Sequence, residues 1–245
     1  MTGPLTVGSL FAGIGGLDLG LERAGMVVKW QVEIDPWCQR VLAKHWPDIS
    51  RFGDVRECGA HNLEPVDLIC GGFPCQDISA AGRRIGISGA RSGLWREYAR
   101  IIGEIRPRFV LVENVADLRS RGLGVVLEDL AACGYDAEWD CLPAAAFGAP
   151  HRRDMAFVVA YAASQQFQEP QTGDGREVLT GRATQIRRCE HWHREPGIRR
   201  VVDGIPAGVD RLRGLGNAVV PQVAEWVGKR IVEADRLWQK EREAA

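Results

Sequence analysis

Short apolar runs alternate with amphipathic stretches through the first two thirds of this sequence. Four of the runs are rich in branched aliphatic residues and predict buried strands, at residues 5–10, 27–33, 66–70 and 109–112. Apolar side chains recur at the helical interval in segments between them, including residues 17–24, 37–45 and 95–105. Repeated strand–helix units predict an α/β fold with a parallel, doubly wound sheet, whose ligands bind at the carboxyl ends of the strands.

The alternation ends after residue 160. Residues 164–208 are polar, rich in Gln, Gly and Arg, and show little periodicity, and a connecting loop of that length is unusual unless it has a function. Residues 219–243 again repeat apolar positions at the helical interval. We therefore divide the chain into a domain of residues 1–163, a small irregular region, and a C-terminal segment of residues 209–245 that completes the domain. The closing helix is expected to pack beside the first strand–helix unit.

Composition places the chain among ordinary globular proteins. It has 245 residues, of which 45% are hydrophobic and 26% charged, and its formal net charge is −1. No run of about 18 apolar residues could span a membrane, and residues 1–4 do not begin a secretory signal, so we expect an intracellular protein. The seven cysteines form no C-x-x-C pair, and neither a disulfide framework nor a metal site is expected.

Glycines follow the first predicted strand directly. Residues 11–16 read Phe-Ala-Gly-Ile-Gly-Gly, between a strand and a helix, where glycine lets the backbone approach a ligand closely. Glu33 follows about 20 positions later at the end of the next strand, where a carboxylate can accept hydrogen bonds from ribose hydroxyls. This arrangement predicts a site for a nucleoside-containing cofactor, although a glycine turn without a ligand can have the same sequence.

Two further strand ends carry side chains suited to catalysis. Cys75 stands in a loop after the third predicted strand, where a thiolate can be exposed and act as a nucleophile. Glu113 ends the fourth strand, and a carboxyl group in apolar surroundings has a raised pKa and can act as a general acid. Each residue alone also fits a structural role. Their shared position at one edge of the sheet favours a catalytic pair.

Taken in order, these motifs resemble those of the C5-cytosine DNA methyltransferase family, over nearly the whole chain. The matching segments are residues 11–16, 33–35, 53–55, 74–76, 92–94, 113–115, 147–153 and 216–221. Any one of them is a weak signal, but the complete order is specific. The resemblance implies a Rossmann-like class I methyltransferase sheet, with residues 164–208 as a small irregular target-recognition insert.

The resemblance also implies a DNA (cytosine-5)-methyltransferase that uses S-adenosylmethionine on double-stranded DNA. In the family a thiolate adds to C6 of the cytosine, because C5 is otherwise too poor a nucleophile. Cys75 would be this thiolate, protonated Glu113 would hydrogen-bond N3, and Arg153 would match the first arginine of the family's arginine motif. The cytosine must be flipped out, since C5 cannot be reached inside a stacked duplex.

Residues matched to the family's cofactor contacts come from several short segments. They are Phe11, Ala12, Gly13, Gly15, Gly16, Glu33, Ile34, Asp54, Val55, Pro74, Leu94, Asn217, Ala218 and Val219. The candidates for DNA contact are basic and come from the loop after Cys75 and from the insert. They are Arg83, Arg84, Arg187, Arg188, Arg194, Arg199 and Arg200. Nine Arg against five acidic residues between positions 176 and 213 favour phosphate contact, although a solvated loop remains an alternative.

The arginine motif departs from the family pattern Gln-x-Arg-x-Arg. His151 stands in place of the Gln, and Met155 stands in place of the second Arg. Since the second Arg helps the family to hold the flipped cytosine, Met155 removes that contact unless neighbouring Arg152 supplies it. We expect the Met155→Arg variant to keep or increase methylation.

Two other interpretations of the same residues stay open. A tRNA cytosine-5 methyltransferase would share the scaffold, and an Arg-rich insert does not separate DNA from RNA. A non-catalytic DNA-binding relative would fit Met155, but it would not need Cys75 and Glu113. The resemblance further implies a cytoplasmic, nucleoid-associated monomer. It would be either a phage enzyme or part of a restriction–modification system. In the second case a restriction endonuclease would accompany it without direct contact. The short insert predicts a short target site.

Overall fold

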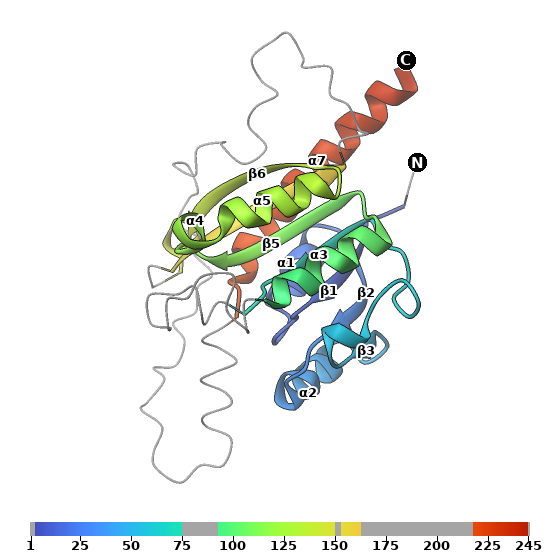
Figure 1. Ribbon diagram of the computed structural model, residues 1–245, viewed down its shortest axis with the longest axis vertical. Helices are drawn as coiled ribbons and strands as arrows, with labels where there is room; N and C mark the ends of the chain where they lie inside the picture. The colour runs from blue at the N-terminus through green and yellow to red at the C-terminus, as the bar shows by residue number, and fades with distance from the viewer. Residues whose placement is uncertain (1–2, 75–92, 150–152, 163–217, 245) are drawn as a thin grey trace.

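The computed structural model of the chain describes residues 3–74, 93–149, 153–162 and 218–244. These residues form a seven-stranded sheet in the order β3-β2-β1-β4-β5-β7-β6 (Figure 1). The strands are β1 (Thr6–Leu10), β2 (Val27–Val32), β3 (Ser50–Phe52), β4 (Leu68–Gly71), β5 (Phe109–Val115), β6 (Tyr135–Pro143) and β7 (Asp154–Ala162). The four strands predicted from apolar runs are confirmed as β1, β2, β4 and β5.

Most of the sheet is parallel, as predicted, and β7 is the exception. β1 to β5 pair with one another in parallel, whereas β7 lies antiparallel between β5 and β6. Residues 144–153 join β6 to β7, and this connection is too short for the crossover that two adjacent parallel strands require. The chain therefore turns back on itself at that point.

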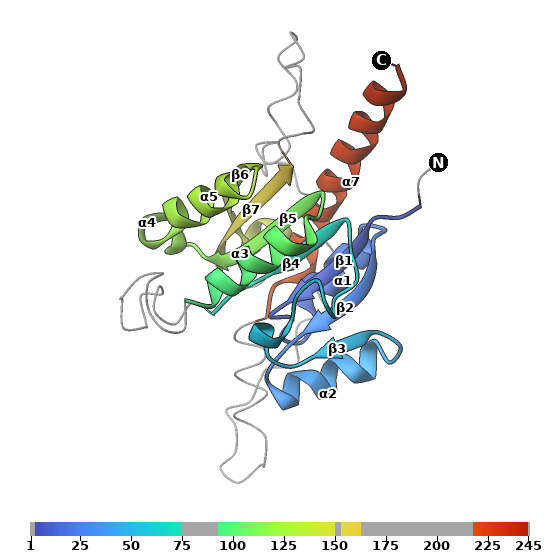
Figure 2. The ribbon, with the colours of Figure 1, turned by 45° about the vertical axis from the view of Figure 1, so that its right-hand side comes forward.

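Helices cover both faces of the sheet. α1 and α7 pack on one face, and α3 and α5 pack on the other (Figures 1 and 2). The helices are α1 (Gly16–Arg23), α2 (Pro36–His45), α3 (Leu94–Ile105), α4 (Leu118–Arg121), α5 (Leu123–Ala132) and α7 (Pro221–Ala244), with 3-10 turns η1 (Val55–Glu57) and η2 (Ala144–Phe147). This two-sided cover buries both faces of the central strands and explains why β4 and β5 read as continuous apolar runs.

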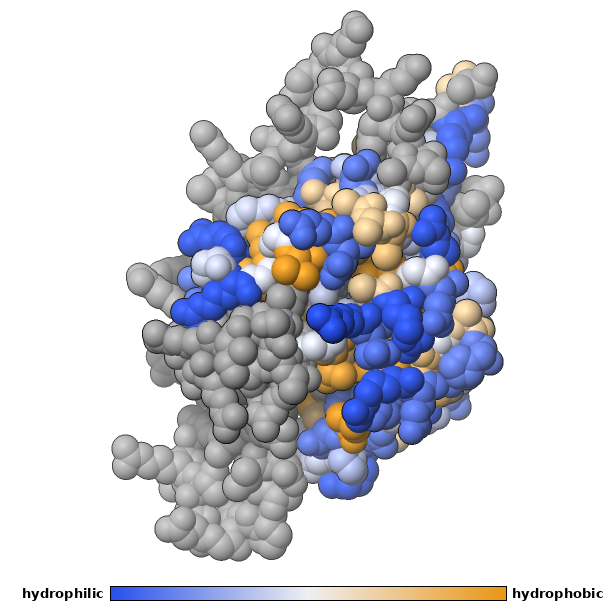
Figure 3. All heavy atoms as spheres, viewed as in Figure 1, coloured by the Kyte–Doolittle hydropathy of each residue, from blue (hydrophilic) through white to orange (hydrophobic). Residues whose placement is uncertain are grey.

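The apolar stripe of α3 illustrates how sequence pattern becomes packing. Trp95, Tyr98, Ile101 and Ile102 are all buried against the sheet. The opposite side of α3 is largely hydrophilic, and Figure 3 shows polar residues covering that part of the surface. No helix of the described residues is long and apolar enough to cross a membrane.

α7 packs against α1, as expected for the closing helix. Glycines make the approach possible: a Cβ at Gly16 would overlap the Val219 carbonyl, and a Cβ at Gly20 would overlap the Pro221 carbonyl. The C-terminal segment therefore returns to the first strand–helix unit. It brings Ala218 and Val219 to the carboxyl end of β1, where the glycine turn also lies.

Candidate active site

A cavity of about 830 Å³ lies at the carboxyl ends of β1, β2, β4 and β5. The loops after these strands form most of its wall, and the start of β7 and the segment before α7 complete it. The residues proposed from sequence that line it are Phe11, Ala12, Gly13, Gly16, Glu33, Ile34, Asp54, Val55, Pro74, Leu94, Glu113, Arg153, Ala218 and Val219. The fold thus gathers distant motifs around one space, where a doubly wound sheet binds its ligands.

The other proposed residues do not line this cavity or are not described. Gly15 lies behind the wall, where a Cβ would overlap the Trp46 ring. Cys75 and Asn217 lie outside the described residues, although their neighbours Pro74 and Ala218 line the cavity. The candidates for DNA contact also lie outside, and they are Arg83, Arg84, Arg187, Arg188, Arg194, Arg199 and Arg200. His151 and Arg152 of the arginine motif lie outside as well.

The glycine turn after β1 takes backbone conformations that other residues rarely adopt. Gly13 and Gly15 have φ values of 58° and 85°, and Phe11 also has a positive φ of 52°. A Cβ at Gly13 would meet no atom within 4 Å, so this backbone faces open space. The turn therefore leaves room for a ligand directly above the N-terminal end of α1.

Glu33 joins the glycine turn to the next strand–helix unit. Its Oε2 accepts a hydrogen bond from the Gly13 amide at 2.7 Å, and its Oε1 accepts one from the Asp35 amide at 2.8 Å. Burial of the carboxyl group raises its pKa, and these backbone hydrogen bonds partly oppose the shift. Asp35 in turn caps α2 by accepting from the amides of Trp37 and Cys38. A carboxylate is thus held in the cavity wall beside the turn.

A second carboxylate enters the cavity from the loop after β3. Asp54 precedes η1 and accepts hydrogen bonds from the backbone amide and the guanidinium of Arg56. The side-chain hydrogen bond from Arg56 lowers the pKa of Asp54, so it carries a negative charge. The next residue, Val55, is buried and supplies an apolar surface to the same wall.

The ends of β4 and β5 bring Pro74 and Glu113 to the opposite side of the cavity. A Cβ at Gly72 would overlap Glu113 Oε2, so only glycine lets the carboxyl group lie this close to the backbone. Asn114 Nδ2 donates to the Phe73 carbonyl at 3.0 Å and holds the segment that leads to Pro74. The sequence continues from Pro74 directly to Cys75.

Glu113 is the most strongly perturbed carboxyl group at the cavity. It is 5% exposed, and burial raises its pKa from 4.5 to about 7, while the positive charge of Arg153 acts in the opposite direction. Its Oε1 atom has no hydrogen-bond partner among the described residues. A protonated carboxyl group with an unpartnered oxygen is suited to bind a polar atom of a substrate.

Arg153 and Met155 lie at the start of β7, beside Glu113. Arg153 Nε donates to Met155 Sδ at 3.4 Å, and both residues line the cavity. Met155 is buried and pairs with Val115 of β5 and Leu142 of β6. The residue that departs from the family's arginine motif thus contacts the arginine that matches it.

Sequence reasoning missed some residues that shape this site. Arg56 lines the cavity and pairs with Asp54, and the only signal for it was an acid and a base two residues apart at a turn. Phe73 lines the cavity and packs on Trp95, and its position before a Pro-Cys pair gave no separate signal. Within the described residues, no group of three or more His, Cys, Asp and Glu could hold a metal ion.

The profile of the C-5 cytosine-specific DNA methylase family matches residues 5–189 of this sequence. The chain belongs to this family. One relative, the type II methyltransferase M2.BsuMI of Bacillus subtilis, is 34% identical over 96% of this chain and 59% of its own length. Another, M.AquIA of a Picosynechococcus species, is 32% identical over 68% of this chain and 76% of its own length. The chain therefore spans about three fifths of the first relative.

Solved structures confirm the predicted α/β methyltransferase fold. The structure of the methyltransferase EhMeth of Entamoeba histolytica superposes with a TM-score of 0.57. The match covers 65% of this chain and 53% of that protein, at 17% sequence identity. The structural match and the family membership therefore both support the predicted fold.

Proposed function

We propose that this chain transfers a methyl group from S-adenosylmethionine to C5 of a cytosine flipped out of a short DNA sequence. The observation that carries this proposal is buried Glu113, protonated below about pH 7 and directly beside the segment that leads to Cys75. The glycine turn and Glu33 lie on the other side of the same cavity. Family membership supports the same reaction.

The described residues fit S-adenosylmethionine as the methyl donor. The cavity has the size of an ordinary cofactor site, about 300–1,000 Å³, and open space lies over Gly13. Glu33 can accept hydrogen bonds from ribose hydroxyls, because each of its oxygens has a lone pair beyond its backbone bond. Exposed Ile34 and buried Val55 offer apolar surface for the adenine, and Asp54 offers an acceptor for its amino group. When bound, the cofactor supplies an electrophilic methyl group.

Cys75 and Glu113 would prepare the cytosine to accept that group. The Cys75 thiolate forms a bond to C6, and the electron pair released from the C5–C6 double bond moves toward N3 and C5. Protonated Glu113 donates a hydrogen bond to N3 and stabilises the negative charge that develops there. After C5 is methylated, its proton leaves to a base and the C6–S bond breaks, which returns the thiolate.

Arg153 would balance the charge of this arrangement. Its positive charge opposes the rise in the pKa of Glu113. The pKa therefore stays in the range in which the carboxyl group can both hold and release a proton. Asn114 fixes the Phe73 carbonyl and so fixes the approach to Cys75. These two residues would orient the catalytic pair.

Trapping the covalent bond tests the proposal directly. The full chain is incubated with S-adenosylmethionine and duplex DNA that contains 5-fluorocytosine, and adducts are detected by a mobility shift that survives denaturation. Because fluorine cannot leave C5 as a proton does, we expect the wild-type chain to be trapped and the Cys75→Ala variant not to be. Glu113→Gln should form the adduct at least 100-fold more slowly, in line with losses on removing one stabilising donor of about 10²–10³.

Bisulfite sequencing of DNA from cells that express the chain would give the target sequence. Methylation of tRNA and not of DNA would replace the DNA substrate in the proposal by RNA. Absence of any adduct over a DNA library that covers all short sequences would favour a non-catalytic DNA-binding protein.

A further inference from the structure

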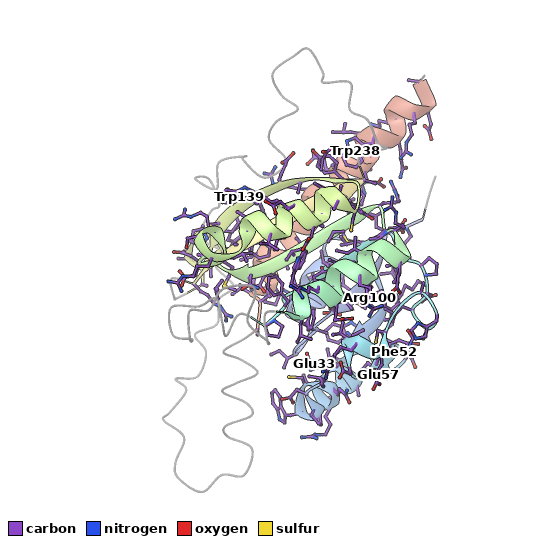
Figure 4. The ribbon with its side chains drawn as sticks, in the orientation of Figure 1. Glu33, Phe52, Glu57, Arg100, Trp139 and Trp238 are labelled. Carbon is purple, nitrogen blue, oxygen red and sulfur yellow. The ribbon has the colours of Figure 1, made fainter. Side chains whose placement is uncertain are left out.

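One side chain on α3 contacts the loop that forms the Asp54 side of the cavity. Arg100 Nη2 donates hydrogen bonds to the carbonyl of Val55 at 3.3 Å and to the carbonyl of Cys58 at 2.7 Å. Figure 4 places Arg100 on α3 next to the segment that carries Phe52 and Glu57. This contact joins parts of the chain that are 42 and 45 residues apart in the sequence.

The loop needs such a partner because of its own geometry. η1 is a single 3-10 turn in which the Cys58 amide donates to the Val55 carbonyl at 3.2 Å, and the carbonyl groups at the end of a helical turn can accept further hydrogen bonds from outside it. A guanidinium offers several fixed N–H donors and makes stronger hydrogen bonds than a neutral group. Arg100 therefore adds a second donor to the Val55 carbonyl and supplies one from α3 to the Cys58 carbonyl at the end of the turn.

Acidic residues on α3 hold Arg100 in this orientation. Glu97 Oε2 accepts from Arg100 Nε at 2.8 Å, and Glu104 Oε1 accepts from Arg100 Nη1 at 2.7 Å. Both pairs follow the helical spacing of three or four residues. With Nε and Nη1 engaged on its own helix, Arg100 directs Nη2 to the loop.

Glu104 also contacts the loop directly. Its Oε2 accepts a hydrogen bond from the Ala60 amide at 3.0 Å. A Cβ at Gly59 would overlap this same oxygen, so glycine at that position permits the contact. Arg100 and Glu104 thus bind the loop through both its carbonyl groups and an amide.

We propose that Arg100 is a positioning residue for cofactor binding, which acts by fixing the Asp54–Val55 wall through the backbone of η1. The Val55 carbonyl that Arg100 binds belongs to the residue whose side chain lines the cavity. Asp54 is tied to the same turn, because the Glu57 amide donates to the Asp54 carbonyl at 3.0 Å. The proposal rests on S-adenosylmethionine being the ligand of this cavity.

The test compares Arg100→Met, Arg100→Lys and Arg96→Met in the full chain. Methionine keeps most of the aliphatic length and removes the loop contacts. Lysine keeps the charge and one donor toward the loop. Arg96→Met is the matched control, because it makes the same substitution at an exposed arginine of the same helix. The dissociation constant of S-adenosylmethionine is measured by calorimetry, and hydrogen exchange is measured without any ligand.

Loss of the loop contacts should weaken cofactor binding without slowing the reaction at saturation. We expect the dissociation constant and KM for S-adenosylmethionine to rise about tenfold in Arg100→Met, which corresponds to about 1.4 kcal/mol, with kcat changed less than about twofold. On a logarithmic scale, Arg100→Lys should recover at least half of this loss of affinity. Arg96→Met should stay within about twofold of the wild-type dissociation constant. In Arg100→Met without ligand, the amides of Glu57, Cys58 and Ala60 should exchange faster, while those of α7 keep their rates.

Two results would overturn the positioning role. One is an unchanged dissociation constant in Arg100→Met, and the other is a loss of binding matched by faster exchange throughout the protein, which would indicate general destabilisation. The failure of the proposed reaction gives a different result: the wild-type chain would bind S-adenosylmethionine but methylate no cytosine, and the effect of Arg100 on binding would still be measured. A wild-type chain that does not bind S-adenosylmethionine would refute both proposals.

Discussion

Glu113 makes the stability of this fold depend on pH within a defined window. Burial raises its pKa from 4.5 in the unfolded chain to about 7 in the folded chain. The folded chain thus holds the proton more tightly, so the stability from this group is complete below pH 4.5 and is lost as pH rises through 7. A difference of about 2.5 pKa units corresponds to about 3 kcal/mol. That is a large part of the usual stability of a domain, about 5–15 kcal/mol.

The Glu113→Gln variant removes this dependence, because glutamine has the shape of the protonated carboxyl group and does not ionise. At pH 4.5 we expect the free energies of unfolding of variant and wild type to agree within about 0.5 kcal/mol, since the Glu113 carboxyl group is neutral in the folded chain and only about half ionised in the unfolded chain there. At pH 8.5 we expect the variant to be more stable by up to about 3 kcal/mol. The same substitution should abolish most methylation, so stability and activity change in opposite directions.

Urea unfolding followed by tryptophan fluorescence measures the effect, at half-unit steps from pH 4.5 to 8.5 and without ligand. The difference between variant and wild type isolates Glu113, because every other titrating group is common to both. A difference that stays constant across this range would refute the reasoning. It would mean that Glu113 has similar proton affinity in the folded and unfolded chains.

Three further substitutions test other parts of the structure. Asp18 is fully buried, and burial raises its pKa from 3.8 to about 6 against hydrogen bonds from Gln31 and Ser9. Asp18→Asn should therefore be more stable than wild type above pH 6 by up to about 3 kcal/mol and equally stable below pH 4, by urea unfolding. Gly72→Ala would force Glu113 to move and should lower kcat at least tenfold, with a stability loss of about 1–3 kcal/mol. Met155→Arg should keep or increase the methylation rate per folded molecule, measured with labelled cofactor. A large loss of methylation in a folded variant would show that the base pocket does not use a second arginine.

The strands that could be predicted are those buried on both faces. β4 and β5 are continuous apolar runs because helices cover the sheet on both sides. β6 lies at the edge of the sheet and carries Asp136, Glu138 and Asp140 among its residues, so it has no continuous apolar run. The direction of β7 depends on the length of the link before it and not on the composition of the strand.

Residues of the site could be predicted where a glycine turn or a reactive side chain stands directly after a strand. The glycine turn, Glu33 and Glu113 each stand at a strand end, and parallel strands bring their carboxyl ends to one edge. Arg100 stands in the middle of a helix and acts on a loop more than 40 residues earlier, which no local pattern indicates. Its function depends on the packing of α3 against η1.

Closure of the fold and completion of the cavity are linked through α7. Val219 forms part of the cavity wall, and its carbonyl packs directly over Gly16 at the start of α1. Ala224 packs over Gly20 one turn later. A side chain at either glycine would push α7 away from α1 and would displace Ala218 and Val219 from the cavity. The small residues of α1 thus shape the cavity as well as the packing, because the last helix of the chain can complete the cavity wall only by lying against the first.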